Sequence, residues 1–376
     1  MVQEAMNILY VQTDGAVLRL DHDNVVVMLS AKNRTSAAGD GGTAGEAARP
    51  GADPEQRRSR AGDAAAASLR VPLHHLQGIV TLGRVSLTSP LLARCAEDGR
   101  AVVVLNSRGK FLYRIEGRRS GNVLLRIAQH RVLHDSEKSV PIVQAVLAGK
   151  LHNSRHVLLR AARDTSDDVA RAELQETAAE IARDLRRLPK VTDLETLRGI
   201  EGINAKRYFA QFPRPLKGAE TWEFSGRTRR PPRDPVNALL SFLYTLLVHD
   251  CVSAAETAGL DPQIGYLHAL RPGRPAMALD LMEELRPVLA DRAAMTLINR
   301  RQLSERDFNH LPGGGVMLNE AGRKTVLDAY QRRKQDTCRH PLFKRTVTFA
   351  MLPYIQARLM ARAIRSDAVY VPFFYR

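Results

Sequence analysis

The sequence has few cysteines and no long apolar stretch, and each shortage argues against a class of protein. Its three cysteines, Cys95, Cys251 and Cys338, lie far apart and lack the Cys-x-x-Cys spacing that is typical of zinc sites and redox pairs. No uninterrupted apolar run approaches the roughly 18 residues needed to cross a bilayer, and the first residues lack the basic segment and apolar core of a signal peptide. We therefore expect an untargeted protein of the reducing cytoplasm, not bound to a membrane.

A phosphate-cradling loop and a balance of charge are also missing. No GxxxxGK[ST] motif is present, which argues against an ATPase of that type. The 56 Lys and Arg residues exceed the 40 Asp and Glu residues, for a formal net charge of +16. This charge favours polyanionic partners, nucleic acid first, although a solvated basic surface without a dedicated partner has the same composition. At 376 residues, 44% of them hydrophobic, the chain is long enough for two globular domains.

The amino-terminal part contains β-rich runs separated by turn residues, which predict short strands. These runs cover residues 8–12, 16–20, 25–29, 69–71, 78–82, 101–105 and 111–115, with a helical stretch at 89–97. The first three runs are joined by turn sequences and predict a meander. Residues 33–67 contain almost no large apolar side chain, so they predict a disordered insertion at the tip of a hairpin.

From about Asn122 onward the apolar residues recur with a helical period, which predicts a mostly helical remainder. Helices are expected at residues 167–187, 193–211, 236–258, 276–300, 318–334 and 343–365. The segment from Pro213 to Pro235 carries five prolines and several arginines, which predicts a basic loop that becomes ordered on a partner. The sequence therefore predicts an α+β protein, with a small β-rich domain at residues 1–118 and a larger all-α domain at residues 119–376.

Acidic residues at helical spacing suggest a metal site. Asp280 and Glu283 are three residues apart and project from one face of a predicted helix, where two carboxylates can share a hard cation. Glu284 lies four residues after Asp280, so spacing alone leaves either glutamate as the second ligand. A solvated acidic helix surface would explain the same spacing.

Further residues near this helix could take part in the same chemistry. His268, Arg271 and Arg274 stand just before it, and an imidazole can join carboxylates on Mg²⁺ or Mn²⁺ while guanidiniums bind phosphate. Glu201 lies between two glycines that let backbone or ligand approach closely. A hydrogen-bonded structural histidine, and a glutamate favoured by a helix dipole, are the simpler explanations for His268 and Glu201 taken singly.

Four sequence runs together resemble the CRISPR-associated protein one family, most of all its type I-C-like branch. The runs are NILYVQTDGAVLRL near the amino terminus, GIEGINAKRYF around Glu201, RPPRDPVNALLSFLYTLL from Arg230 to Leu247, and GLDPQIGYLHALRPGRPAMALDLMEELRP from Gly259 to Pro287. They occur in the family's order, and the resemblance covers nearly the whole chain outside residues 33–67.

The resemblance implies a metal-dependent DNA integrase and endonuclease of CRISPR adaptation, built from an amino-terminal β-rich domain and a helical catalytic domain. The residues that match the family's catalytic ligands for Mg²⁺ or Mn²⁺ are Glu201, His268, Asp280 and Glu283. Those expected to line the site or to contact DNA are Asn237, Tyr244, Arg230, Arg233, Arg271 and Arg274. In the implied reaction, the 3′-hydroxyl of a foreign fragment attacks a phosphate at a CRISPR repeat. The implied partners are double-stranded DNA, a second copy of the chain and CRISPR-associated protein two.

Two other functions remain open on the sequence. One is a stand-alone, structure-specific DNA nuclease that cuts branched DNA and never integrates a fragment. The other is a non-enzymatic basic scaffold whose acidic residues lie on the surface without a catalytic role. Covalent joining of a labelled fragment to a repeat plasmid would separate the integrase from both.

Overall fold

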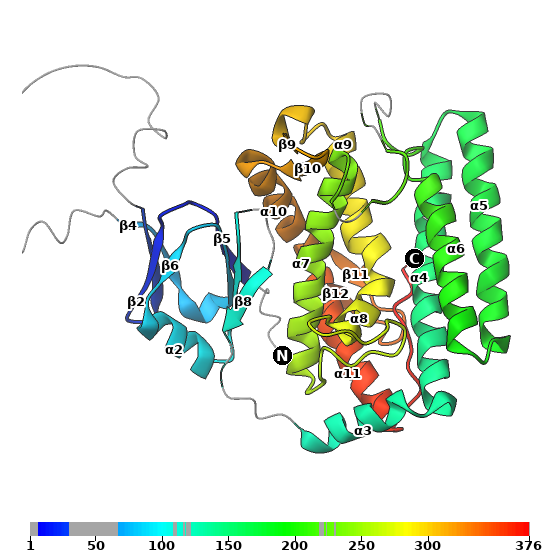
Figure 1. The fold of residues 1–376 in the computed structure, drawn as a ribbon, viewed down its shortest axis with the longest axis horizontal. Helices are drawn as coiled ribbons and strands as arrows, with labels where there is room; N and C mark the ends of the chain where they lie inside the picture. Colours follow the sequence, from blue (N-terminus) through cyan, green and yellow to red (C-terminus); the bar gives the residue numbers. More distant parts are fainter. Residues whose placement is uncertain are drawn as a thin grey trace, which may run out of the picture. The chain divides into compact units, whose positions relative to one another are not determined.

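The computed structural model describes residues 7–29, 67–107, 111–115, 117, 122–217, 222, 224–228 and 231–375. The chain divides into two compact units, residues 1–119 and 120–376 (Figure 1). The first unit is β-rich and the second is mainly helical, which confirms the predicted α+β class. Apart from residue 67, the insertion predicted at residues 33–67 lies outside the described residues, and so does Arg230.

The amino-terminal unit consists of two small sheets and a helix around one core. Its elements are β1 (Asn7–Val11), β2 (Val17–Asp21), β3 (Asn24–Met28), β4 (Ala67–Pro72), β5 (Leu76–Leu82), β6 (Ser86–Leu87), α2 (Ser89–Glu97), β7 (Ala101–Leu105) and β8 (Phe111–Ile115). The strand orders are β1-β5-β7-β8 and β4-β3-β2-β6. Apolar side chains from both sheets and from α2 fill the space between them, among them Leu18, Val25, Ile79 and Leu91. Each sheet thus buries one face against the same core.

The first strand does not pair as the meander predicted. β1 runs parallel to β5 in one sheet, whereas β2, β3 and β4 pair antiparallel in the other. The pairing of β3 with β4 confirms that the insertion joins the two strands of a hairpin. The period of two in a strand shows that one face is buried, but it does not show which strand supplies the backbone partner. Placing β1 beside β5 brings Val11 into the shared core.

The second unit is a group of helices with two short hairpins. The helices are α3 (Val123–Leu133), α4 (Ser136–Asp164), α5 (Asp168–Arg187), α6 (Leu194–Ala210), α7 (Pro235–Thr257), α8 (Ala276–Arg286), α9 (Arg292–Asn299), α10 (Glu320–Gln335) and α11 (Leu352–Ile364). The hairpin strands are β9 (Phe308–Leu311), β10 (Gly315–Leu318), β11 (Thr337–Arg339) and β12 (Thr346–Thr348). The sequence pattern did not predict these hairpins, because strands of three or four residues are too short for a period to stand out.

Two of the predicted helices are interrupted. The helix expected at residues 276–300 passes through a π-helical turn at Pro287–Asp291, because Pro287 has no backbone N–H with which to continue the helical ladder. The helix expected at residues 343–365 begins only at Leu352, after β12 and a short 3-10 turn. The first interruption leaves α8 and α9 as separate segments on either side of the turn.

Aspartates fix where the helices next to the candidate site begin. The side chain of Asp193 accepts a hydrogen bond from the backbone N–H of Thr196 at the start of α6, and that of Asp234 accepts one from Asn237 at the start of α7. Asp135 caps α4 in the same way. Each carboxylate satisfies an N–H group that the first helical turn leaves without a partner, so each helix begins at a defined residue.

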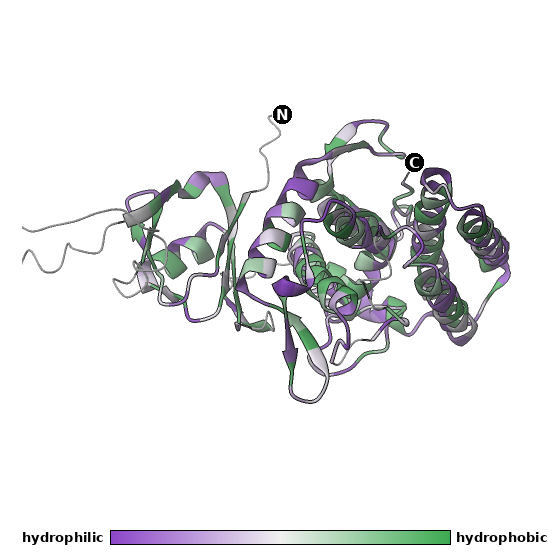
Figure 2. Cartoon of the chain, turned by 90° about the horizontal axis from the view of Figure 1, so that it is seen from above, coloured by the Kyte–Doolittle hydropathy of each residue, from purple (hydrophilic) through white to green (hydrophobic). Residues whose placement is uncertain are grey.

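α7 is a helix of the core. Among the described residues it alone is long and apolar enough to cross a membrane, yet 61% of its most apolar window is buried inside the protein. It packs against α8 and α11. Figure 2 shows hydrophobic and hydrophilic residues sharing the other helices of this unit, the pattern of helices that bury one face. The apolar sequence of α7 therefore matches its place between neighbouring helices.

A buried glutamate ties α8 to the carboxyl-terminal segment. The carboxylate of Glu284 accepts hydrogen bonds from the Tyr370 hydroxyl, the Gln356 amide and the backbone N–H of Phe373. The side chain of Asn153 on α4 donates to the carbonyls of Glu284 and Phe373, at 2.7 and 2.9 Å. Burial raises the pKa of Glu284 from 4.5 to about 7, although these donors act in the opposite direction. The segment after α11 thus holds α8 in place from the interior.

The raised pKa of Glu284 predicts a pH-dependent stability. Because the folded protein binds this proton more tightly than the unfolded chain, the stabilisation is complete below pH 4.5 and is lost as the pH rises through about 7. A shift from 4.5 to about 7 corresponds to roughly 3 kcal/mol. In metal-free buffer, urea unfolding followed by circular dichroism at pH 5, 6, 7 and 8 should show this decline.

Glu284→Gln removes the titrating group and should flatten the decline in the free energy of unfolding. Glu176→Gln, on the exposed side of α5, is the matched control and should leave the decline unchanged. An equal decline in Glu284→Gln and in the unaltered protein would contradict the role assigned to Glu284.

Candidate active site

Asp280 organises the loop that precedes α8. One carboxylate oxygen accepts hydrogen bonds from the backbone N–H groups of Tyr266 and Leu267, at 2.6 and 3.0 Å. The other lies 3.1 Å from the backbone nitrogen of His268 and 2.7 Å from its Nδ1. A carboxylate has only lone pairs to offer Nδ1, so this ring nitrogen carries the proton and Nε2 is directed away from Asp280. Asp280 is 1% exposed, and its contacts are with the loop and the imidazole.

The loop can approach Asp280 because Gly265 has no side chain. A Cβ atom at this position would lie 2.5 Å from the carbonyl carbon of Ala276 and 2.6 Å from a carboxylate oxygen of Asp280. Arg198 on α6 holds the loop from the other side, since its Nε donates to the carbonyl of Leu267 at 2.8 Å. The position of His268 is therefore fixed by α8 and α6 together.

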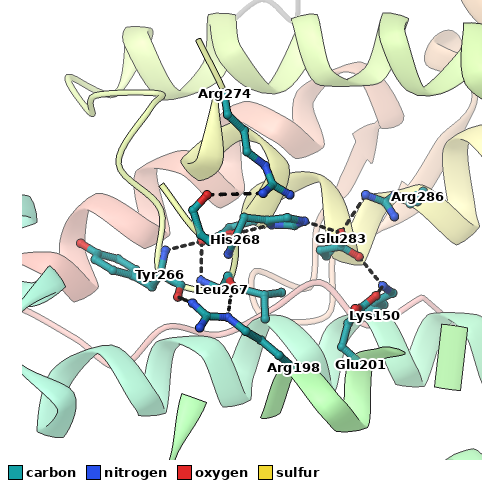
Figure 3. Close-up of polar contacts among 11 residues, drawn as sticks. Lys150, Arg198, Glu201, Tyr266, Leu267, His268, Arg274, Glu283 and Arg286 are labelled. Carbon is teal, nitrogen blue, oxygen red and sulfur yellow. Dashed lines mark hydrogen bonds and ion pairs between the residues drawn. The ribbon is translucent and has the colours of Figure 1, made fainter. Parts of the chain in front are cut away.

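Two carboxylates and the imidazole meet at one place (Figure 3). Glu283 projects from α8, Glu201 from α6, and Lys150 reaches them from α4. The Lys150 ammonium forms an ion pair with Glu201 and lies 2.6 Å from Oε2 of Glu283. Nε2 of His268 lies 3.5 Å from Oε1 of Glu283. The structure thus brings together Glu201, His268 and Glu283, and places Asp280 directly behind the imidazole.

Close packing of α4 on α8 makes the Lys150 contact possible. A Cβ atom at Gly149 would lie 2.9 Å from the Cβ atoms of both Glu284 and Pro372, so the two helices approach at a residue without a side chain. The neighbouring residue, Lys150, is directed at Glu283. The two glutamates that spacing could not distinguish therefore face different ways, with Glu283 toward the site and Glu284 toward the interior.

Cations around Glu283 keep its carboxylate ionised. The side chain is 1% exposed, and this burial acts to raise its pKa. Arg286, whose Nη2 lies 2.7 Å from Oε1, together with Lys150 and His268, outweighs the burial and holds the pKa of Glu283 below its usual value. The carboxylate is thus available as a charged ligand.

A stack of guanidinium groups and an aromatic ring borders the acidic cluster. The ring of Tyr244 contacts both Arg227 and Arg286, whose guanidinium carbons are 5.2 and 4.9 Å from its centre. Its hydroxyl donates to Asp291 at 2.6 Å. Burial raises the pKa of Tyr244 well above its usual value, so the phenol stays neutral. Tyr244 therefore borders the site, although its contacts are with protein groups.

Asn237 holds the arginine-rich loop before α7. Its Oδ1 accepts hydrogen bonds from Arg227 and from the backbone N–H of Thr228, at 2.7 and 2.9 Å. Its amide nitrogen donates to the carbonyl of Gly226 and to Asp234. Asn237 is fully buried, so the structure gives it a role in shaping the loop.

The remaining predicted DNA contacts lie on loops. Arg233 and Arg271 are exposed, and Arg274 is half-buried with its guanidinium 3.4 Å from the carbonyl of Ala269. Arg230 lies outside the described residues. Exposed guanidinium groups on such loops suit contacts with a phosphate backbone.

Sequence reasoning missed Lys150 and Arg286, the two cations nearest Glu283. Arg286 is three residues after Glu283 on α8, a spacing that brings the two side chains together on one helix face. Lys150 follows the apolar residues Val146 and Leu147 on α4 and precedes Leu151. A lysine within an apolar helix face is a signal that could have been followed, because lysine is rarely buried without a partner.

The donor set suits a divalent cation. Two carboxylates and an imidazole nitrogen are ligands that Mg²⁺ or Mn²⁺ accept. The ammonium of Lys150 already lies between Glu201 and Glu283, so these carboxylates are arranged around a single positive charge. Across the described ranges, no group of three His, Cys, Asp or Glu side chains stands ready to hold a metal ion. The donor types therefore fit a divalent metal, and the Lys150 ammonium occupies the space between the two carboxylates.

Comparison with known sequences finds matches over the whole chain. A family model described as "CRISPR associated protein Cas1" matches residues 55–332. CRISPR-associated endonuclease Cas1 1 of Moorella thermoacetica is 47% identical over 373 residues, which is 99% of each chain. CRISPR-associated endonuclease Cas1 2 of Rhodospirillum rubrum is 43% identical over 381 residues, covering the full length of both.

Solved structures share the fold. A casposase bound to its integration product superposes with a TM-score of 0.75 at 21% identity, over 99% of this chain and 95% of that one. A Cas1 protein from Thermotoga maritima gives a TM-score of 0.75 at 20% identity, over 97% of this chain and 99% of that one. From the family match and from relatives of nearly equal length, we conclude that this chain belongs to the CRISPR-associated Cas1 family.

Proposed function

We propose that this chain is a divalent-metal-dependent DNA endonuclease and integrase that inserts foreign DNA fragments at a CRISPR repeat. Two contacts carry the proposal: Glu201 and Glu283 share one cation, Lys150, and Nε2 of His268 lies 3.5 Å from Oε1 of Glu283. The names of the relatives support nuclease activity, because proteins 43% and 47% identical to this chain are called endonucleases. A casposase with its integration product is a structural neighbour, which makes fragment joining a reasonable extension.

The ligands and their supports have separate roles in the proposed reaction. Glu201, Glu283 and His268 would hold the metal, which when bound stabilises the negative charge that develops on the attacked phosphate. Asp280 keeps the imidazole in the required tautomer and orientation. A fragment's 3′-hydroxyl attacks the phosphorus at the repeat, the new 3′-oxygen-to-phosphorus bond replaces the old one, and the repeat's own 3′-oxygen leaves. Hydrolysis differs only in that water attacks, so neither reaction needs a covalent enzyme intermediate.

The proposed partners are double-stranded DNA, a second copy of the chain and a Cas2 protein. A complex titled Cas6-RT-Cas1–Cas2 contains a chain that superposes at a TM-score of 0.74 and 22% identity, covering 100% of this chain and 37% of that one. That likeness supports the fold, and its title motivates the choice of Cas2. The type I-C-like branch, the homodimer and the use of Mg²⁺ or Mn²⁺ stay predictions.

A strand-joining assay tests the proposed function. A labelled DNA fragment is incubated with a supercoiled repeat plasmid, the purified chain, Cas2, and Mg²⁺ or Mn²⁺. Glu201→Gln, Glu283→Gln and His268→Ala should each lower joining at least about 100-fold, because each removes a ligand from the charge that stabilises the transition state. Asp280→Asn should lower it about 10- to 100-fold by releasing the imidazole from its orientation.

Glu176→Gln on exposed α5 is the matched control and should join fragments at the normal rate. Circular dichroism confirms that each variant is folded. Undiminished joining by Glu201→Gln or Glu283→Gln would remove the site from the mechanism. Cleavage without any joined product would favour the stand-alone nuclease, and inactivity of the unaltered protein with either metal would favour the scaffold.

DNA binding should depend strongly on salt, because a fragment would be held mainly by its phosphates. With roughly 6 to 10 phosphate contacts, affinity should fall by about 10³ to 10⁵ between 50 and 200 mM salt. Arg271→Ala and Arg274→Ala should each reduce the slope of log affinity against log salt by about one. Fluorescence anisotropy with a labelled duplex measures both effects. A flat response to salt would exclude a backbone grip of this size.

A further inference from the structure

Lys150 is buried in the centre of the candidate site. Its side chain is 8% exposed, and its ammonium contacts both Glu201 and Glu283. These partners explain how a lysine can remain charged in such a place, because an isolated ammonium would cost far too much free energy to bury. The position between the two carboxylates is the one a divalent cation would need.

The four charged groups joined by these ion pairs balance one another without a metal. Glu201 and Glu283 supply two negative charges, and Lys150 and Arg286 supply two positive ones. A divalent cation added to this set would face two nearby cations as well as its ligands. Binding is therefore opposed unless one of the two side chains withdraws.

Arg286 is the less able of the two cations to leave. Its guanidinium is buried, paired with Oε1 of Glu283 and stacked on the ring of Tyr244 at 4.9 Å. Lys150 instead carries its charge at the end of a flexible four-carbon stem, and it occupies the space between the ligands itself. Withdrawal of Lys150 would clear the cation position, whereas withdrawal of Arg286 would not.

Lys150 lines a small cavity that could accept its ammonium group after displacement. The cavity has a volume of about 20 Å³, enough for about one water molecule, and Lys150, Ser154, Asn204, Arg286 and Asp291 are among its lining residues. An ammonium group is similar in size to a water molecule. Asp291 and Ser154 are polar members of this lining, and the carboxylate of Asp291 could offset the charge of an ammonium beside Arg286.

We propose that Lys150 is an internal cation that occupies the metal position in the metal-free protein and withdraws into the adjoining cavity when a divalent ion binds between Glu201 and Glu283. The inference rests on the proposed metal-dependent function. Lys150 keeps two carboxylates together before the metal arrives, and it lowers metal affinity because the ion has to displace it. A purely structural ion pair would stay in place and would leave metal affinity unchanged or weaken it when removed.

Metal titration of the full-length chain tests this displacement. Mn²⁺ is added to the protein without DNA, and the free ion is measured by its electron paramagnetic resonance signal. Lys150→Met removes the competing charge with little change in side-chain length. The Kd of this variant for Mn²⁺ should therefore be lower than that of the unaltered protein by a factor of about ten or more. Lys150→Gln, which is uncharged but polar, should also bind more tightly and serves if Lys150→Met does not fold.

Lys138→Met removes the charge of an exposed lysine that pairs with Asp135 at the start of α4, and it should leave the Kd unchanged. Glu283→Gln in the Lys150→Met background should abolish the gain, which places the ion at these ligands. In the unaltered protein, Mg²⁺ should shift the side-chain NMR signal of Lys150, assigned in that protein by through-bond correlation to its backbone. An unmoved signal would overturn the proposal even if both substitutions unfold the chain.

The possible outcomes separate this inference from the proposed function. Tight Mn²⁺ binding by the unaltered protein, with equal or weaker binding by the Lys150 variants, would overturn the displacement and leave the metal-dependent function standing. Absence of Mn²⁺ binding in every form would overturn both. Tighter binding by Lys150→Met and Lys150→Gln, with Lys138→Met unchanged, would support the displacement.

Discussion

The helical unit is organised around a buried negative charge that needs a positive partner. Glu283 is almost completely enclosed, and a lone carboxylate at that depth would become protonated or destabilise the fold. Lys150 from α4 and Arg286 from α8 supply the compensating charge, while Glu201 from α6 adds a second carboxylate. Helices that are far apart in the sequence thus meet at one electrostatic centre. The apolar packing of these helices fixes where the charged groups lie. The ion pairs then offset the free-energy cost of burying those charges.

Adjacent glutamates on α8 illustrate how environment sets chemistry. Glu283 is surrounded by cations that lower its pKa, whereas Glu284 lies among neutral donors in the interior and has a pKa of about 7. Successive residues on a helix are about 100° apart, so one glutamate can face the site while the next faces the core. Asp280 has a third role, since it accepts hydrogen bonds from the loop and from His268. Three neighbouring carboxylates therefore have different surroundings: Glu283 faces Lys150 and Arg286, Asp280 supports the loop and the imidazole, and Glu284 anchors the interior.

The sequence predicted those features that depend on interactions between residues near one another in the chain. The change from β-rich to helical character near Asn122, and most helix positions, follow from residue periodicity. The resemblance pointed to Glu201, His268, Asp280 and Glu283 as ligands. The structure brings Glu201, His268 and Glu283 together, and it directs the carboxylate of Asp280 at the loop backbone and at Nδ1 of His268. The partner of β1, the two short hairpins and the direction of Glu284 depend on contacts between distant segments, which periodicity does not encode. Lys150 was not predicted for the same reason, because its ion-pair partners lie on α6 and α8, far from it in the sequence.

The arginine-rich loop and the acidic cluster are connected by a series of side-chain contacts. Asn237 holds the loop to the start of α7 and accepts a hydrogen bond from Arg227, which also contacts the ring of Tyr244. The same ring also contacts Arg286, the direct partner of Glu283. The loop that carries Arg227 is therefore linked to Glu283 through the ring of Tyr244 and the guanidinium of Arg286.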